Sequence, residues 1–210
     1  MTVELILGDC LDVMRGMADK SVDAVITDPP YGINNNHAGG RGINGWRDFT
    51  NDGNWDKERP AKNNFDEIIR VSKNQIIWGG NYFSDYLFPS MQFLIWDKGQ
   101  RDFSLADCEM AWSSKHAAAR IFGYSRSKLN QENGFHPTQK PVSLMKWCIE
   151  LSTNPNDTIL DPFMGSGTTG VACVQLNRNF IGIEIDEGYY KIAEKRIHDA
   201  QQQPLLWEVG

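Results

Sequence analysis

Residues 158–170 read TILDPFMGSGTTG, an apolar run that passes directly into a turn rich in glycine. The apolar run is typical of a buried strand, and the residues from the last glycine to about Leu176 are typical of a helix. Gly165, Gly167 and Gly170 satisfy the pattern GxGxxG, which lets a ligand approach the backbone and face the N-terminus of the helix. The pattern alone is not specific, because it suits a dinucleotide equally well and can also serve tight packing only.

The strand that follows this helix favours a nucleoside-like ligand in a Rossmann-type crevice. Residues 179–185 read NFIGIEI, and this strand ends near Glu184, an acidic residue placed to bind ribose hydroxyls. Further strands are expected at 3–7, 22–26, 74–80, 91–96, 108–114 and 118–124, the last two as antiparallel edge strands. Helices are expected at 11–18, 61–72, 82–87, 141–151 and 187–200. This alternation favours an α/β fold with a mainly parallel sheet and helices on both faces.

A second motif, DPPY at residues 28–31, follows the apolar run 22–26. Adjacent prolines fix the backbone, so the Asp28 carboxylate and the Pro29 carbonyl are two acceptors that point in set directions. Two fixed acceptors suit an NH2 group, which has two hydrogens to donate, and Tyr31 adds a flat ring on which a base could stack. Taken alone, the same residues are more often a strand terminator with an exposed aspartate than a catalytic site.

The composition is that of an ordinary globular protein. Its 210 residues fit one domain, with 40% hydrophobic and 23% charged residues. The net charge of −6 argues against a protein that coats nucleic acid indiscriminately, but only a DNA contact face would have to be positive. No apolar stretch approaches the ~18 residues of a membrane span, and the N-terminus lacks the basic segment of a signal peptide. The four cysteines form no CxxC pair and no histidines cluster with them, so we expect reduced thiols, a cytoplasmic protein and no metal site.

Together the two motifs resemble those of the DNA methyltransferases that modify amino groups, the adenine-N6 and cytosine-N4 family, in its permuted (beta) arrangement. In that arrangement DPPY precedes the cofactor glycine motif, as it does here. The family's other segments match in order: GDC at 8–10, IIWGGNYF at 76–83, HPTQKP at 136–141, DPFMGSGTT at 161–169 and FIGIE at 180–184. The resemblance implies a Rossmann-like, S-adenosylmethionine-dependent methyltransferase fold with a mainly parallel seven-stranded sheet, and a single domain over residues 1–210.

The resemblance also implies a role for each candidate site residue. Asp28 and Pro29 would accept hydrogen bonds from the target amino group, Pro30 would complete the rigid turn, and Tyr31 would stack on the flipped base. The cofactor would be held by Phe163, Gly165, Ser166, Gly167 and Thr168 at its methionine part, by Glu184 at its ribose, and by Asp9 with the Cys10 backbone at its adenine edge. Asp161 is also expected among the residues that bind it. Lys140 is expected to pair with the cofactor carboxylate.

These roles predict transfer of a methyl group from S-adenosylmethionine to the N6 amino group of adenine in DNA. The target base leaves the duplex, and its amino nitrogen attacks the methyl group in line with the departing sulfur. In the family, Asp at position 28 is typical of adenine enzymes and Ser of cytosine-N4 enzymes, which are the main alternative. An RNA or protein-glutamine methyltransferase and a non-enzymatic DNA-binding subunit are more distant rivals. A NAD-dependent dehydrogenase built on GSGTTG would leave DPPY and HPTQKP without a role.

Basic residues indicate where DNA could lie. The run 113–131 contains no acidic residue, and we expect a short target-recognition segment at about 97–135. A glycine-rich loop at about 32–59 could close over bound DNA. The candidate DNA contacts are Arg41, Arg47, Lys115, Arg120, Arg126 and Lys128. A short segment predicts a short or relaxed recognition site, in a restriction–modification or phage setting, and a homodimer could supply further contacts.

Overall fold

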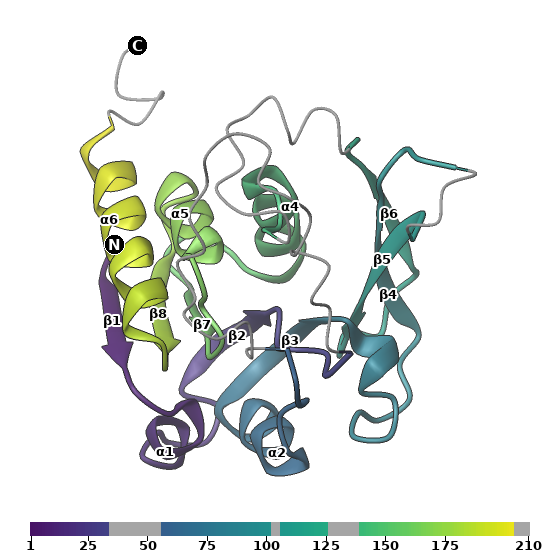
Figure 1. Ribbon diagram of the computed structural model, residues 1–210, viewed down its shortest axis with the longest axis horizontal. Helices are drawn as coiled ribbons and strands as arrows, with labels where there is room; N and C mark the ends of the chain where they lie inside the picture. The colour runs from purple at the N-terminus through teal and green to yellow at the C-terminus, as the bar shows by residue number, and fades with distance from the viewer. Residues whose placement is uncertain (34–55, 102–105, 126–138, 204–210) are drawn as a thin grey trace.

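The computed structural model describes residues 1–33, 56–101, 106–125 and 139–203. These residues form an eight-stranded sheet with helices against both of its faces (Figure 1). The strands are β1 (Val3–Leu7), β2 (Val22–Thr27), β3 (Ser72–Trp78), β4 (Gln92–Asp97), β5 (Cys108–Ser113), β6 (Arg120–Gly123), β7 (Thr158–Asp161) and β8 (Asn179–Glu184). The helices are α1 (Cys10–Arg15), α2 (Lys62–Val71), α4 (Val142–Ser152), α5 (Thr168–Gln175) and α6 (Glu187–Gln202), with the short 3-10 helix η2 (Gly80–Tyr82).

The strand order is β1-β8-β7-β2-β3-β5-β4-β6, and neighbouring strands are parallel except in the two pairs that include β5. The predicted α/β fold with a mainly parallel sheet is confirmed, with eight strands in place of seven. Strands 108–114 and 118–124 were both expected to be antiparallel edge strands, which is wrong in two respects. β5 is antiparallel but lies inside the sheet, and β6 lies at the edge but runs parallel to β4. Alternating hydrophobicity indicates that one face of a strand is exposed to solvent. It does not indicate which strands lie beside it or in which direction they run.

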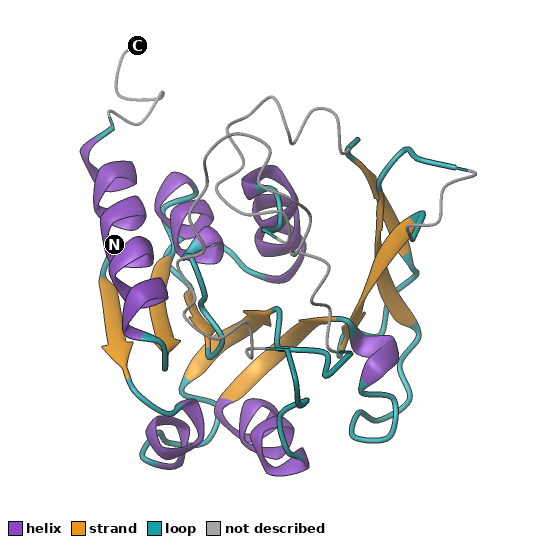
Figure 2. Cartoon of the chain, viewed as in Figure 1, coloured by secondary structure: helices purple, strands orange, loops and turns teal. Residues whose placement is uncertain are grey.

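Hydrophobic layers on the two faces of the sheet hold the helices in place. Successive residues of β2 point to opposite faces, so Ala24 and Ile26 pack with residues of α4, α5 and α6, whereas Val25 packs with residues of α1 and α2. Figure 2 shows the corresponding arrangement, with helices above and below the sheet. Burial on both faces explains why the central strands of the sequence are short and almost wholly apolar.

The chain changes its direction of travel across the sheet between β2 and β7. From β7 it passes through α5 to β8 on one side, and from β2 it passes through α2 to β3 on the other. Such a switch point leaves a crevice beyond the carboxyl ends of the two strands, which is where open α/β sheets bind ligands. DPPY follows β2 and the glycine motif follows β7, so the fold brings both motifs to the carboxyl ends of these two neighbouring strands, where the rule places a ligand. Thr27 on β2 donates a hydrogen bond to Asp161 on β7 at 2.7 Å.

Residues 82–87, which were expected to be helical, form only the end of η2 and a turn in which the amides of Tyr86 and Leu87 donate to the Phe83 carbonyl. Most of the expected loop 32–59, and parts of the segment 97–135, fall outside the described residues. Within the described ranges, no helix is long and apolar enough to cross a membrane. The same ranges contain no group of His, Cys, Asp and Glu side chains that could hold a metal ion.

Candidate active site

Asp28 lies directly after β2, and both oxygens of its carboxylate are held. The Tyr31 hydroxyl donates to Oδ1 at 2.6 Å, and Lys140 Nζ donates to Oδ2 at 2.6 Å. The backbone of the motif is held as well, because Asp56 Oδ1 accepts from the amides of Tyr31 and Gly32 at 2.8 and 2.9 Å. The DPPY motif is therefore a rigid turn whose acid and ring are fixed relative to each other.

Lys140 is buried, with 7% of its side chain exposed, and oxygen atoms surround its ammonium group. Besides the Asp28 contact, Nζ lies 2.9 Å from Glu109 Oε2 and 3.3 Å from Tyr31 Oη. Burial acts to lower the pKa of Lys140, but the nearby charges, that of Asp28 first, raise it well above its ordinary value. The contacts with Asp28 and Tyr31 are hydrogen bonds, and the contact with Glu109 is an ion pair without hydrogen-bond geometry at Oε2. Lys140 was expected at the cofactor carboxylate, whereas its contacts here are with the DPPY motif and with β5.

Glu109, on β5, connects Lys140 to a second largely buried lysine. Glu109 Oε1 lies 2.6 Å from Nζ of Lys98, whose side chain is 11% exposed. Burial acts to raise the pKa of Glu109, but the ammonium groups of Lys140 and Lys98 outweigh it and lower the pKa to about 2. Lys98, Glu109, Lys140 and Asp28 thus form a row of alternating charge, which we call the ion-pair row, and their formal charges cancel.

Tyr31 belongs to an aromatic cluster. Its ring stacks on that of Tyr82, with centroids 4.8 Å apart and planes inclined by 16°, and Phe83 meets it edge-on. Gly79 lies against the same ring at a φ of +68°, and a Cβ there would come within 2.1 Å of Tyr31 Cε1. Tyr82 is 40% exposed, and Arg59 Nη1 donates to its carbonyl at 2.9 Å. A base that reaches this site would meet a pair of tyrosine rings instead of an isolated one.

The glycine motif uses glycine for two different purposes. Gly165 and Gly167 both have positive φ, of +53° and +81°. A Cβ on Gly165 would meet nothing within 4 Å, whereas a Cβ on Gly167 would lie 2.9 Å from Cβ of Ala193 on α6. Gly165 therefore faces open space after β7, where a ligand can approach the backbone, and Gly167 is required for α5 to pack on α6. Arg196 of α6 binds the same loop, because its Nη1 donates to Ser166 Oγ at 2.8 Å.

Glu184 ends β8 beside this loop and is held by two backbone amides. Its Oε2 accepts from Gly165 at 2.7 Å and its Oε1 accepts from Asp186 at 2.8 Å. Burial raises the pKa of Glu184 above its ordinary value. A carboxylate oxygen can accept more than one hydrogen bond, so Glu184 can take hydroxyl donors while it holds the loop. A Cβ on Gly8, directly after β1, would also meet nothing within 4 Å, and the Gly8 amide donates to the Glu184 carbonyl at 2.9 Å.

Asp9 and Cys10 lie next to this space, where β1 leads into α1. Asp9 is the N-cap of α1, with Oδ1 accepting from the amides of Leu11 and Asp12 at 2.7 and 3.4 Å. The Cys10 thiol lies 3.4 Å from Asn64 Oδ1, and burial raises its pKa to about 12, so the thiol is uncharged. The expected contact of these residues with the cofactor adenine stays a prediction.

Asp161 was expected to bind the cofactor, but the hydrogen bonds of its buried carboxylate run to other parts of the fold. Its Oδ1 accepts from Thr27 at 2.7 Å, and its Oδ2 accepts from Thr169 at 2.6 Å. The amide of Phe163 also donates to Oδ1, at 3.2 Å. Burial raises the pKa of Asp161 to about 6. These contacts give Asp161 a structural role, which is to tie β2 and α5 to β7 below the crevice.

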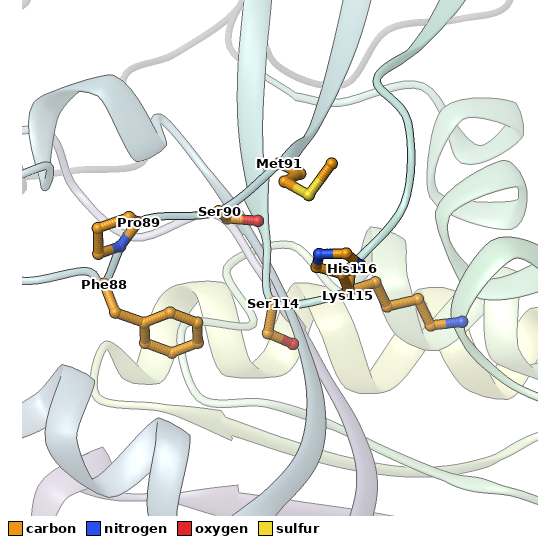
Figure 3. A pocket seen from close by; sticks show the side chains of 7 residues that line it. All are labelled: Phe88, Pro89, Ser90, Met91, Ser114, Lys115 and His116. Atoms are coloured by element: carbon orange, nitrogen blue, oxygen red, sulfur yellow. The ribbon is translucent and has the colours of Figure 1, made fainter.

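Of the predicted DNA contacts, Lys115 and Arg120 fall within the described residues. Lys115 follows β5 at the end of the sheet remote from Asp28, and its Nζ donates to the Leu151 carbonyl at 2.5 Å. It lines a pocket of about 300 Å³ together with Phe88, Pro89, Ser90, Met91, Ser114 and His116 (Figure 3). This position argues against contact between Lys115 and DNA bound at Asp28. Arg120 is exposed at the start of the edge strand β6. Arg41, Arg47, Arg126 and Lys128 lie outside the described residues, as does His136.

Several residues of the site had no predicted role in the sequence. Tyr82 lies inside the segment IIWGGNYF, where only its aromatic character could have drawn notice. Glu109 is an acid in the otherwise apolar strand CEMAW, and a charge in such a strand is a signal of a buried ion pair. Lys98, Asp56 and Arg196 stand in polar surroundings, so the sequence offers no signal for them.

The chain is similar to known DNA methyltransferases in sequence and in fold. Residues 95–195 match the family model N6_N4_Mtase, described as DNA methylase. The chain is 30% identical over 237 residues to the Type II methyltransferase M2.MboI of Moraxella bovis. The aligned region covers 91% of this chain and 86% of that protein. It is similar to the solved complex of M1.HpyAVI with S-adenosylmethionine, with 26% identity, a TM-score of 0.60 and coverage of 93% and 99% of the two chains. The cytosine-N4-specific PvuII DNA methyltransferase shares the fold, at 15% identity, a TM-score of 0.62 and coverage of 96% and 92%.

The site has the properties that S-adenosylmethionine requires. Open space at Gly165 and Gly8 leaves room for a ligand against the backbone, and Glu184 offers acceptors to a ribose between them. The DPPY acid follows β2, which pairs with the strand β7 that leads into the glycine loop, so a bound methyl donor and a target amino group would meet at the same ends of these strands. The chain belongs to the DNA methylase family of adenine-N6 and cytosine-N4 methyltransferases, which use S-adenosylmethionine as cofactor.

Proposed function

We propose that this protein methylates the exocyclic N6 amino group of adenine in DNA and that residues 1–210 act as one methyltransferase domain. The observation that carries the proposal is Asp28, a carboxylate fixed at the end of β2, beside the strand that leads into the glycine loop. Aspartate at this position supports adenine as the target, by the family tendency noted above. In this proposal DNA is the macromolecular substrate.

Asp28 acts as an oriented acceptor in this proposal. An aromatic amino group is a poor nucleophile, because its lone pair is delocalised into the ring. Acceptors that draw the amino hydrogens out of the ring plane free that lone pair for attack. Tyr31 and Lys140 each donate one hydrogen bond to Asp28, and a carboxylate has about four lone-pair sites, so capacity remains for a target N–H. The Pro29 carbonyl is the second acceptor. Holding the reactants roughly 3–3.5 Å apart supplies much of the acceleration.

The cofactor supplies, when bound, a methyl group on a positively charged sulfur. Gly165 and Gly8 leave room for it, and Glu184 would accept hydrogen bonds from its ribose while it accepts from the Gly165 amide. Phe163, Gly165, Ser166, Gly167 and Thr168 would hold its methionine part, and Asp9 and Cys10 would hold its adenine. Arg196 fixes Ser166 in this loop. We assign Lys140 to Asp28 and not to the cofactor carboxylate, because its ammonium group already hydrogen-bonds Asp28 and Tyr31 and is ion-paired with Glu109.

The target base reaches the site by leaving the duplex, at a cost of a few kcal/mol. In this proposal it stacks on the aromatic pair of Tyr31 and Tyr82, whose rings are nearly parallel. A base stacked there would lie near Asp28, because the Tyr31 hydroxyl contacts that carboxylate at 2.6 Å. Stacking is worth about 1–3 kcal/mol per base, which offsets much of the cost of extrusion.

The test is transfer of an isotope-labelled methyl group to unmethylated DNA, followed by digestion to nucleosides. Labelled N6-methyladenine is the expected product. Labelled N4-methylcytosine would assign the chain to the other branch of its family, and no labelled nucleoside would refute the proposal. Asp28→Ala should abolish transfer and leave the affinity for S-adenosylmethionine nearly unchanged. An equal loss of both in a folded variant would contradict the role of Asp28.

A further inference from the structure

Lys98 and Glu109 lie outside both sequence motifs, yet they complete the ion-pair row that ends at Asp28. Lys98 follows β4, Glu109 is on β5, and Lys140 precedes α4. The successive N–O distances along the row are 2.6, 2.9 and 2.6 Å. Elements far apart in the chain thus converge on the carboxylate to which the proposed function gives the target amino group.

Burial gives this row an energetic significance that a surface pair lacks. The Lys195–Asp199 pair on α6 has the same 2.6 Å separation, but its side chains are 77% and 55% exposed, so it contributes little. Lys140 is almost fully removed from water, and a buried ion costs several kcal/mol unless it is compensated. Asp28 alone would have to compensate Lys140 while it also accepts a substrate N–H. Glu109 supplies the second negative charge that relieves Asp28 of that conflict.

We propose that Glu109, itself fixed by Lys98, is a positioning residue that holds the Lys140 ammonium against Asp28. The inference rests on the proposed role of Asp28 as acceptor. Lys140 takes one lone-pair direction of Asp28 Oδ2, so its position decides where the remaining lone pairs point. When Glu109 loses its charge, Lys140 is drawn toward Asp28 alone, and the carboxylate turns away from the target amino group.

A relay that carries the reaction's proton along the row is a poor alternative. Glu109 would have to accept a proton from Lys140 while Asp28 delivers one to it. The pKa of Glu109 is about 2, so this carboxylate is a weak base and stays ionised. The pKa of Lys140 lies well above its ordinary value, so the ammonium gives up its proton reluctantly. The row therefore acts through position and charge.

The row predicts a characteristic pH dependence. Among the residues that the structure describes, the titratable groups that face Lys140 are Asp28 and Tyr31 after β2, Glu109 on β5 and Cys148 on α4. Burial raises the pKa of both the Cys148 thiol and the Tyr31 hydroxyl, so neither carries charge. Glu109→Gln removes one of the two negative charges near a buried ammonium, so the pKa of Lys140 must fall. A neutral Lys140 no longer orients Asp28, and transfer should fail at a lower pH than in the wild type.

The experiment compares Glu109→Gln and Lys98→Met with Asp199→Asn, which breaks the exposed α6 pair and serves as the matched control. The measurements are kcat for transfer to DNA, the Kd for S-adenosylmethionine, and kcat as a function of pH. Glu109→Gln should lower kcat by about 10- to 100-fold, the usual effect of a misplaced catalytic group. Its basic limb should move to lower pH, while the cofactor Kd stays unchanged. Lys98→Met should show a smaller change in the same direction, and Asp199→Asn should show none.

The outcomes separate a positioning role of Glu109 from general damage to the site. Wild-type kcat and an unmoved basic limb in Glu109→Gln would overturn the inference. Equal losses of kcat and cofactor affinity would overturn it too, because they report general damage to the crevice. If Glu109→Gln fails to show a cooperative thermal transition, Lys98→Met is judged by the same two readouts. A wild-type protein that methylates neither adenine nor cytosine would refute the proposed function itself, which the first assay establishes before any variant is made.

Discussion

The two positive-φ glycines of the glycine loop allow a matched test of which residue serves the ligand and which serves the fold. Their φ angles are +53° at Gly165 and +81° at Gly167, so alanine at either position costs about 1–2 kcal/mol of backbone strain. Their surroundings differ. Nothing lies within 4 Å of a Cβ at Gly165, whereas a Cβ at Gly167 would lie 2.9 Å from Ala193 Cβ and 3.2 Å from Ile197 Cδ1. Overpacking of this kind adds about 1–3 kcal/mol.

Gly165→Ala should therefore lower the free energy of unfolding by about 1–2 kcal/mol, and Gly167→Ala by about 2–5 kcal/mol. Since natural domains are stable by about 5–15 kcal/mol, the second change removes a large part of the total. For a chain of this length, each kcal/mol shifts the Tm by about 2–4 °C. The expected falls in Tm are then about 2–8 °C for Gly165→Ala and about 4–20 °C for Gly167→Ala.

The ranking of the two variants should reverse for cofactor affinity, so that Gly165→Ala has the larger effect. Gly165→Ala places a methyl group in the open space next to the amide that donates to Glu184, where the proposed cofactor lies against the backbone. Its Kd for S-adenosylmethionine should rise more than that of Gly167→Ala, measured by calorimetric titration at a temperature where both variants are folded. Wild-type affinity in Gly165→Ala would refute this location of the cofactor. A Gly167→Ala variant as stable as Gly165→Ala in urea would refute the packing argument.

Tyr31→Phe removes the hydroxyl that donates to Asp28 at 2.6 Å, so kcat should fall by about tenfold or more, since a hydrogen bond to a charged group contributes about 1.5–3 kcal/mol. Tyr31→Ala should lose stacking as well, so steady-state kinetics should show a larger loss for Ala than for Phe, and equal losses would assign the whole effect to the hydroxyl. Tyr82→Ala should raise the KM for DNA more than the KM for S-adenosylmethionine, because it removes the exposed ring of the stack; an unchanged KM for DNA would exclude Tyr82 from the base site. The pKa of Asp161 is raised from 3.8 to about 6, so its contribution to stability is fully present below its unfolded pKa and is lost as the pH rises through about 6. Asp161→Asn should flatten this part of the pH dependence of the urea midpoint, and an unchanged slope between about pH 4 and pH 7 would contradict the raised pKa.

The two sequence motifs predict the fold class and the place of the site for a physical reason. DPPY and the glycine turn each end an apolar run, and the carboxyl ends of parallel strands meet at one edge of a sheet. Glu184 follows by the same logic, because it ends the next strand. These expectations depend on local signals, so a single sequence suffices for them.

The partners of Lys140 could not be predicted in that way. The sequence places Lys140 before a helix, and its contacts depend on where β5 enters the sheet. β5 lies between β3 and β4, and in this position Glu109 contacts both Lys140 and Lys98. Strand insertion is a long-range property, and the apolar alternation of CEMAW predicts a strand without predicting its neighbours. Asp161 illustrates the same limit, because its buried carboxylate depends on hydroxyls supplied by Thr27 and Thr169.

The permuted order of the motifs leaves the geometry of the site unaffected, because adjacency in the sheet replaces adjacency in the chain. β2 and β7 pair in parallel at Ala24 with Ile159 and at Val25 with Leu160, and the Thr27–Asp161 hydrogen bond extends this contact toward the crevice. Neither interaction depends on where the chain begins.

The same topology makes Asp28 the meeting point of the two halves of the sheet. On one side lie β7, β8 and β1, which border the proposed cofactor site, and on the other lie β3, β5 and β4, which lead to the ion-pair row. In the first half, Asp161 hydrogen-bonds Thr27, the residue before Asp28. In the second half, the ion-pair row holds the Asp28 carboxylate through Lys140. In the proposed function, a base bound beside one half meets a cofactor bound beside the other. Asp28, anchored to both halves, is well placed to be the acceptor for the target amino group.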